Sequence, residues 1–139
     1  MLKRITAGSL TALAFVTAVG LATPANAEAS ANVSVGTQYG SVLRGQFHQN
    51  VDGSGYFFRT YGSADCTSTT SDVDIQISNM TDYAWDNAAS WAQDYNGCDT
   101  KLFRYKDFDT ALTGWIDYGS TGQSLSGALN NLTTSFKLS

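Results

Sequence analysis

Alternating apolar and polar residues predict several short strands in the second half of the chain. Between residues 72 and 78, Val73, Ile75 and Ile77 alternate with polar side chains, and this period of two is typical of a strand with one buried and one solvent-facing side. Aromatic or apolar runs bounded by turn residues predict further strands at 56–61, 101–105, 112–118 and 134–138. Only residues 82–92 contain a helix-like piece, too short to span a domain. The pattern predicts an all-β fold.

The N-terminal pattern is different and predicts a cleaved export signal. Lys3 and Arg4 precede an apolar run over residues 5–22, and Ala25-Asn26-Ala27 follows it, which is the small-x-small pattern that a signal peptidase accepts. A membrane anchor needs about 20 solidly apolar residues, whereas threonine, serine and glycine dilute this run. We therefore expect a signal peptide at 1–27, a secreted extracellular protein, and no membrane attachment after the signal is removed.

Composition narrows the class of protein further. The 139 residues have room for one domain, only 14% of them are charged, and the net charge is −4, so the chain is less charged than the roughly 25% of an average soluble protein. The basic residues are scattered singly, which argues against binding to nucleic acid. Residues 28–55 are rich in glycine, serine, asparagine and glutamine. We expect them to form a loosely packed segment with one strand and an exposed His48, and we expect a monomer.

The two cysteines, Cys66 and Cys98, both follow the predicted signal peptide. In an exported protein such a pair most simply forms a disulfide, and closing this loop would restrict the unfolded chain by about 3–4 kcal/mol. The rival interpretation is a reactive thiol pair or a metal site. It finds no support in the spacing, because the chain has no CxxC sequence and only one histidine.

Two stretches of the chain repeat at nearly the same offset. Residues 57–59 return at 102–104, and the polar turn 86–91 returns at 130–135, so each half consists of strands followed by a polar turn and a last strand. Two four-stranded units would occupy 56–98 and 99–139 of a domain spanning 56–139. Each unit exposes an apolar face, so together they predict a two-sheet antiparallel sandwich.

These residues resemble a known family. The paired turns Asp86-Asn87-Ala88-Ala89-Ser90-Trp91 and Asn130-Asn131-Leu132-Thr133-Thr134-Ser135 are similar to those of βγ-crystallin domains, as is the aromatic-x4-aromatic pattern from Phe103 to Phe108. The resemblance covers Gly55–Ser139. More narrowly, the chain resembles the secreted crystallin-fold proteins of filamentous bacteria, namely the metalloproteinase inhibitors of peptidase inhibitor family I36 and their killer-toxin-like relatives. It implies two Greek-key motifs in a βγ-crystallin-like antiparallel sandwich.

The paired turns are the candidate metal site. Calcium takes six to eight oxygen ligands, and the turns offer carboxylate, amide and hydroxyl oxygens from Asp86, Asn87, Ser90, Asn130, Asn131 and Thr134. The resemblance implies that each ion would be clamped between both turns, with the main-chain carbonyls of Ala88 and Leu132 assisting. In the alternative interpretation these side chains only bind their own backbone, as Asp and Asn commonly do in turns.

Candidate catalytic residues are few, so we expect a protein that is not an enzyme. His48 is the single imidazole, and the carboxylate pairs Asp72/Asp74 and Asp107/Asp109 suggest no cleft. Trp91 and Trp115 could anchor a partner if they are exposed.

The resemblance implies an inhibitor-like binding protein acting on an extracellular protease. The alternatives are a calcium-binding structural or stress protein, and a killer-toxin-like or glycan-binding module.

Overall fold

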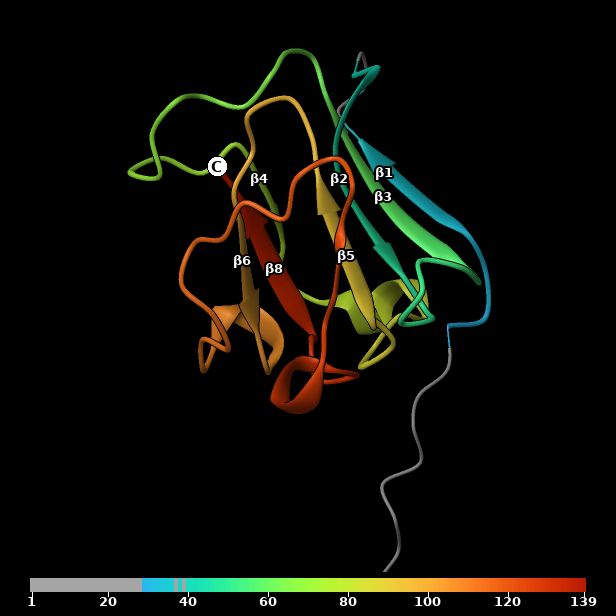
Figure 1. Cartoon of the computed structure of the whole chain (residues 1–139). Helices are drawn as coiled ribbons and strands as arrows, with labels where there is room; N and C mark the ends of the chain where they lie inside the picture. Colours follow the sequence, from blue (N-terminus) through green and yellow to red (C-terminus); the bar gives the residue numbers. More distant parts are fainter. Residues whose placement is uncertain (1–28, 37, 39) are drawn as a thin grey trace, which may run out of the picture.

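The computed structural model describes residues 29–36, 38 and 40–139, so the predicted signal peptide lies outside the described residues. Within this part of the chain, no helix is long and apolar enough to cross a membrane. Eight strands account for most of the regular structure (Figure 1): β1 Val33–Gly36, β2 Val42–His48, β3 Phe57–Gly62, β4 Ile75–Ile77, β5 Trp91–Asp94, β6 Thr100–Phe103, β7 Gln123–Ser124 and β8 Ser135–Leu138.

The strands form two sheets, and each half of the chain contributes one strand to the sheet built mainly by the other half. The five-stranded sheet has the order β1-β3-β2-β5-β7, and the three-stranded sheet has the order β4-β8-β6. In the first half, β5 returns to lie beside β2, as the fourth strand of a Greek key does, while β4 joins the opposite sheet. The second half mirrors this arrangement, because β8 lies beside β6 while β7 pairs with β5.

This topology confirms the predicted fold class, an all-β sandwich of two Greek-key motifs. The pairs that build the two keys are antiparallel. One addition was not predicted: β1 lies along the edge of the five-stranded sheet and pairs with β3 in parallel.

The expectation of a loosely packed segment at 28–55 differs from the structure. This segment contains β1 and β2, and β2 lies between β3 and β5 with Phe47 fully buried. The polar composition of this segment is misleading, because its buried glutamine finds a hydrogen-bond partner and its glycine makes room for the core. Gln46 donates to Gln93 at 2.8 Å, and a Cβ at Gly45 would come within 2.8 Å of a Leu138 methyl group. The first Greek key therefore begins at β2, before residue 56.

Half of the predicted internal repeat is also corrected. The turns 86–91 and 130–135 are equivalent, since each precedes the last strand of its key. Residues 57–59 and 102–104 are not equivalent, because β3 is the second strand of the first key and β6 is the first strand of the second. The two keys have connections of different length, so no single offset aligns their strands.

Two local predictions fail for identifiable reasons. Residues 82–92 form no α-helix; a 3-10 turn at Met80–Tyr83 ends at Ala84, whose φ of 56° is left-handed. Residues 112–118 run beside β6 through the isolated bridges Thr100↔Ile116 and Phe103↔Ala111, without a regular strand. Two residues separate Thr100 from Phe103 in β6, whereas four residues separate their partners Ile116 and Ala111, so this segment must bulge away from the ladder.

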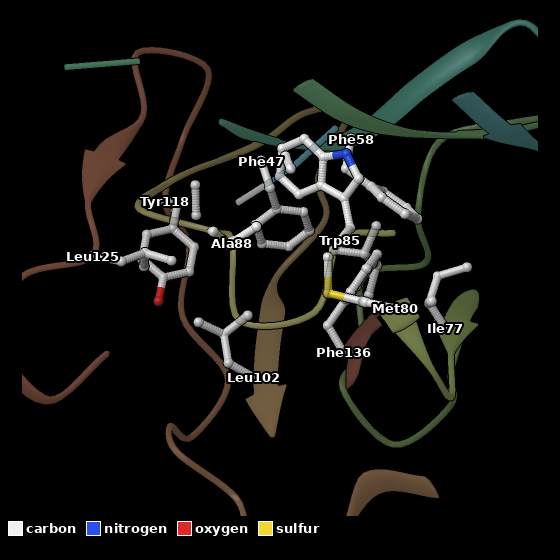
Figure 2. Packing of buried hydrophobic residues seen from close by; sticks show 14 residues of the cluster. Phe47, Phe58, Ile77, Met80, Trp85, Ala88, Leu102, Tyr118, Leu125 and Phe136 are labelled. Carbon is white, nitrogen blue, oxygen red and sulfur yellow. The ribbon is translucent and has the colours of Figure 1, made fainter. Parts of the chain in front are cut away.

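Aromatic rings from both sheets fill the interior (Figure 2). Phe136 of β8 lies with its ring centroid 4.6 Å from that of Phe47 and 5.8 Å from that of Phe58. Trp85 packs edge-on against Phe58 and is fully buried, and its indole N–H donates to the Ala31 carbonyl at 2.8 Å. The core thus joins the two keys and also holds the segment before β1 in place.

The predicted disulfide is confirmed. Cys66, in the connection between β3 and β4, is bonded to Cys98, which lies between the two keys. The Cys66 N–H also donates to the Asn96 carbonyl at 3.0 Å. The bridge therefore ties the long β3–β4 connection to the junction of the keys.

Candidate functional site

The two polar turns lie against each other, as the duplicated pattern predicts. We call residues 86–91 the first corner and residues 130–135 the second corner. The Asn87 N–H donates to the Thr133 carbonyl at 3.2 Å, and the Asn131 N–H donates to the Ala89 carbonyl at 3.0 Å. Asn87 and Asn131 occupy equivalent positions, as do Ala89 and Thr133, so the two bonds are related by an approximate two-fold axis between the keys.

Asparagine is well suited to the turning position of each corner. Asn87 has a φ of 52° and Asn131 a φ of 56°, and asparagine tolerates this left-handed region better than other residues with a Cβ. Both residues precede the backbone carbonyls that accept the crossed bonds. The same residue type therefore supplies the turn and leaves its side chain free to face the other corner.

Side chains cross between the corners in the same symmetric manner. The Ser90 hydroxyl donates to Asn131 Oδ1 at 2.9 Å. The Thr134 hydroxyl donates to Asp86 Oδ1 at 2.6 Å and lies 3.5 Å from Asn87 Oδ1. Five of the six predicted calcium ligands are thus brought into two small oxygen clusters, each containing atoms of both corners.

The sixth residue, Asn130, differs from the others. Its side-chain oxygen is buried and has no hydrogen-bond partner among the described residues, and the same is true of the Thr133 hydroxyl. The resemblance implies that the main-chain carbonyls of Ala88 and Leu132 assist in binding. Ala88 is buried, and Leu132 lines an open groove beside the corners.

An open groove of about 780 Å³ runs along the corners. The groove is lined by Asp86, Asn87 and Thr134 of the corners and by Arg104 and Lys106. Both cations are exposed and follow β6 in the chain. The only carboxylate of the corners therefore shares its groove with two cations. No group of three or more His, Cys, Asp or Glu side chains stands ready to hold a metal among residues 29–36, 38 and 40–139.

The two tryptophans proposed as partner anchors are both half-buried. The Trp91 ring packs directly against Gly122 and Gly53. A Cβ on Gly122 would be 2.2 Å from Trp91 Nε1, and one on Gly53 would be 3.3 Å from Trp91 Cε2. Trp115 lies on the other sheet, with the Lys101 ammonium 6.0 Å from its ring centroid. They belong to different sides of the molecule and form no joint surface.

His48 is not exposed, contrary to the expectation. It is half-buried at the end of β2, where its Nε2 contacts the Gln46 amide, and its buried Nδ1 has no partner among the described residues. Burial is the main cause that lowers the pKa of His48, and the charge of Arg59 adds to it. His48 belongs to a polar row on the outer face of the five-stranded sheet, in which Arg59 donates to Gln46 and Gln46 donates to Gln93.

The predicted carboxylate pairs serve structural contacts. Asp74 lies 3.4 Å from Arg44 in an ion pair, and both Asp72 and Asp74 accept from the Thr67 hydroxyl at 3.0 and 3.1 Å. Asp107 and Asp109 occupy exposed turn positions.

Sequence reasoning missed one buried carboxylate. Asp94 is only 2% exposed and accepts bonds from the Thr100 hydroxyl at 2.9 Å, the Tyr118 N–H at 3.0 Å and the Gly119 N–H at 2.6 Å. Burial raises the pKa of Asp94 to about 6, against the hydrogen bonds, which favour its charged form. An aspartate on the buried face of an alternating strand is the signal that could have found it.

Proteins similar to this chain are found among solved structures. No protein-family model matches the sequence, and no curated protein matches it. Among solved structures, the chain is similar to a mutant βγ-crystallin domain from Clostridium beijerinckii, with a TM-score of 0.47, 11% identity, and coverage of 68% of this chain and 95% of that one.

A double mutant of clostrillin in complex with nickel gives the same TM-score, identity and coverage. A double mutant of the βγ-crystallin domain from Clostridium beijerinckii has a TM-score of 0.46 and 12% identity, covering 68% of this chain and 94% of that one. The fold described above rests on the strand order of this chain itself.

Proposed function

We propose that this protein is an extracellular binding protein, not an enzyme, and that its paired corners bind calcium. The observation that supports this most directly is the crossing of oxygen atoms between the corners: Ser90 Oγ lies 2.9 Å from Asn131 Oδ1, and Thr134 Oγ1 lies 2.6 Å from Asp86 Oδ1. Secretion and a monomeric state remain parts of the same proposal, supported by the N-terminal sequence and by the small size of the chain.

The oxygen spacing suits calcium. Two ligands about 2.4 Å from one ion and about 72° apart, as in a pentagonal bipyramid, lie about 2.8 Å from each other. The crossed pairs have this spacing, and Asn130 contributes a buried oxygen that lacks a partner. The residues therefore fit one calcium ion at each cluster. Asp86, Asn87 and Thr134 would hold one ion, and Ser90, Asn130 and Asn131 would hold the other.

The charge balance points to weak binding. The clusters share a single carboxylate, Asp86, and Arg104 and Lys106 line the same groove. Calcium sites with few charged ligands belong to the class of extracellular modules, with dissociation constants of about 10⁻⁴–10⁻³ M. We expect an affinity in this range.

Calorimetric titration of chelator-treated protein with Ca²⁺ tests the proposal, with Mg²⁺ as a comparison. We expect heat from Ca²⁺ binding, and we expect Asp86→Asn to weaken it about tenfold because the one charged ligand is lost. Asp82→Asn is the matched control, since Asp82 is exposed and bonds only to Asn79 nearby. Absence of both heat and thermal stabilisation at about ten times the expected dissociation constant would leave the corners as structural turns only.

A second function, inhibition of an extracellular protease, is favoured by the hairpin loop between β2 and β3. Residues 49–56 are held by the bonds from the Asn50 N–H to the Ser54 carbonyl at 3.2 Å and from Asn50 Nδ2 to the Ser54 hydroxyl at 3.0 Å. Ser54 in turn donates to Asp52 through its N–H and its hydroxyl. Val51 projects from this loop with 52% of its surface exposed.

A loop held in one shape loses little entropy when it docks into a protease cleft. A screen against thermolysin-like metalloproteases tests this function, and inhibition should be lost in Val51→Asp. Val73→Asp is the matched control, because Val73 is 43% exposed and lies outside the loop. Equal inhibition by both variants would exclude the loop as the inhibitory element, and a lack of inhibition by the unmodified protein would exclude the function for the enzymes screened.

The resemblance supports a third function, that of a killer-toxin-like or glycan-binding module. Pull-down with cell-wall material distinguishes it from the two functions above.

A further inference from the structure

Two lysines face each other on the outer side of the three-stranded sheet. Lys101 of β6 and Lys137 of β8 are directly paired in the antiparallel register, and their neighbours Leu102, Phe136 and Leu138 point into the core. Both lysines therefore project from the face of this sheet that is turned away from the five-stranded sheet. Figure 1 shows the two sheets as separate layers. Like charges placed directly opposite on adjacent strands repel each other.

Protein carboxylates do not relieve this repulsion. Within the described residues the one ion pair is Arg44–Asp74, so neither lysine has a carboxylate within 4.0 Å. Each ammonium instead lies over aromatic rings: Lys137 Nζ is 4.2 Å from the Phe108 centroid and 5.7 Å from that of Phe103. Lys101 Nζ is 5.6 Å from the Phe103 centroid and 6.0 Å from that of Trp115.

The rings fix the position of the two charges without neutralising them. An ammonium over an aromatic face is attracted by the ring quadrupole but keeps its charge, and both lysine residues are half-buried. Two positive charges are thus held side by side on the three-stranded sheet of a protein whose net charge is −4. A ligand with adjacent negative charges would turn an unfavourable pair into a favourable one.

We propose that this face, made of Lys101, Lys137, Trp115 and the neighbouring Gln76, binds an acidic polysaccharide built from uronic acids. Carboxylates of the chain would pair with the two lysines, and the half-buried Trp115 ring offers an apolar surface on which a sugar can stack. Gln76 pairs with Lys137 in the register of β4 and β8 and is exposed, so its amide extends the row with a neutral group for sugar hydroxyls.

The sparse charge of the face favours a glycan over a nucleic acid or an anionic membrane. Duplex DNA carries one negative charge per about 1.7 Å of its axis and requires many cationic contacts. This face offers two ammonium groups beside an amide and an indole, on a molecule with an overall negative charge. A uronate chain, with one carboxylate per sugar and hydroxyls between, matches such a row better. The proposal depends neither on calcium at the corners nor on the hairpin loop.

Isothermal titration with polygalacturonate tests the proposal, with fully methyl-esterified polygalacturonate as the uncharged counterpart. The titration is run in a chelator at low ionic strength, so that its outcome is independent of calcium at the corners. We expect the acidic polymer to bind and its methyl ester to bind at least tenfold more weakly. Lys101→Gln and Lys137→Gln should each weaken binding about fivefold, the size of one solvent-screened ion pair.

Arg59→Gln is the matched control, because Arg59 belongs to β3 of the five-stranded sheet and lies outside the face. It removes the same charge and should change the affinity less than twofold. A separate thermal unfolding measurement should show that Lys137→Gln is at least as stable as the unmodified protein, since the repulsion is relieved. Equal losses in Arg59→Gln and Lys137→Gln, equal binding to single-stranded DNA or to anionic lipid vesicles, or no binding to polygalacturonate would each overturn the proposal.

Discussion

The buried Asp94 carboxylate should make the domain less stable as the pH rises from 4 to 7. Its side chain is only 2% exposed, and burial raises its pKa from 3.8 to about 6. Between these two values the folded protein holds a proton that the unfolded chain has released. Because stability changes with pH according to the protons bound in each state, the free energy of unfolding falls with rising pH across this window.

The size of the effect follows from the pKa difference. Each unit corresponds to about 1.36 kcal/mol, so a rise from 3.8 to about 6 would remove up to about 3 kcal/mol. The value of about 6 already includes the three hydrogen bonds donated to the carboxylate, which oppose the effect of burial. We expect a loss of up to about 3 kcal/mol, most of it between pH 4 and pH 7.

Urea denaturation of the unmodified protein and of Asp94→Asn at several pH values between 4 and 7 measures this contribution. Asparagine cannot accept all three bonds, so the variant should be less stable by about 1–2 kcal/mol at neutral pH. The difference between the two proteins, however, should grow toward pH 4. Asp65→Asn, at an exposed position, should show no such trend. If the advantage of Asp94 instead increases with pH, hydrogen bonding outweighs burial and the reasoning is wrong.

Other changes test the core, the disulfide and the tight turn before β7. Phe136→Ala should lower the free energy of unfolding by about 3–5 kcal/mol, measured by urea denaturation, because the ring is fully buried between two other aromatic rings. Replacing both disulfide cysteines by serine should cost about 3–4 kcal/mol in the same assay. Gly122→Ala should cost about 2–4 kcal/mol and alter tryptophan fluorescence, because its Cβ would meet Trp91 at a φ of 71°, whereas Gly114→Ala meets nothing within 4 Å and should be nearly neutral.

Features set by a short stretch of sequence could be predicted. The strands at β3, β6 and β8 follow from local apolar content and turn residues, and the corners follow from a polar pattern that occurs twice. The disulfide needed only the number of cysteines and the predicted export signal. The strands depend on residues that are neighbours in the chain, whereas the corners and the disulfide follow from a repeat and a cysteine count that need no knowledge of the fold.

Features set by partners far away in the chain could not be predicted. β2 looks like a polar loop, and its central place becomes clear only when Gln93 and Leu138 are seen beside it. The Lys101–Lys137 pair likewise arises from the register of β6 and β8, although the two residues are scattered in the sequence. Basic residues that are isolated along the chain can thus form a charged pair through strand pairing, which the sequence pattern alone does not show.

The hydrogen bonds between the corners use the same oxygen atoms as the proposed calcium site. In the hydrogen-bonded state the Ser90 and Thr134 hydroxyls each donate to an oxygen of the opposite corner. To ligate a cation, both hydroxyl hydrogens must turn away, so the free energy of those two bonds, about 1 kcal/mol each, is subtracted from the binding of the metal. A cation at the proposed site would replace bonds that already join the two Greek keys, so its net effect on stability would be the free energy of metal binding minus that of the displaced bonds. The affinity of the proposed site would therefore be limited by the strength of these hydrogen bonds, as well as by the single carboxylate.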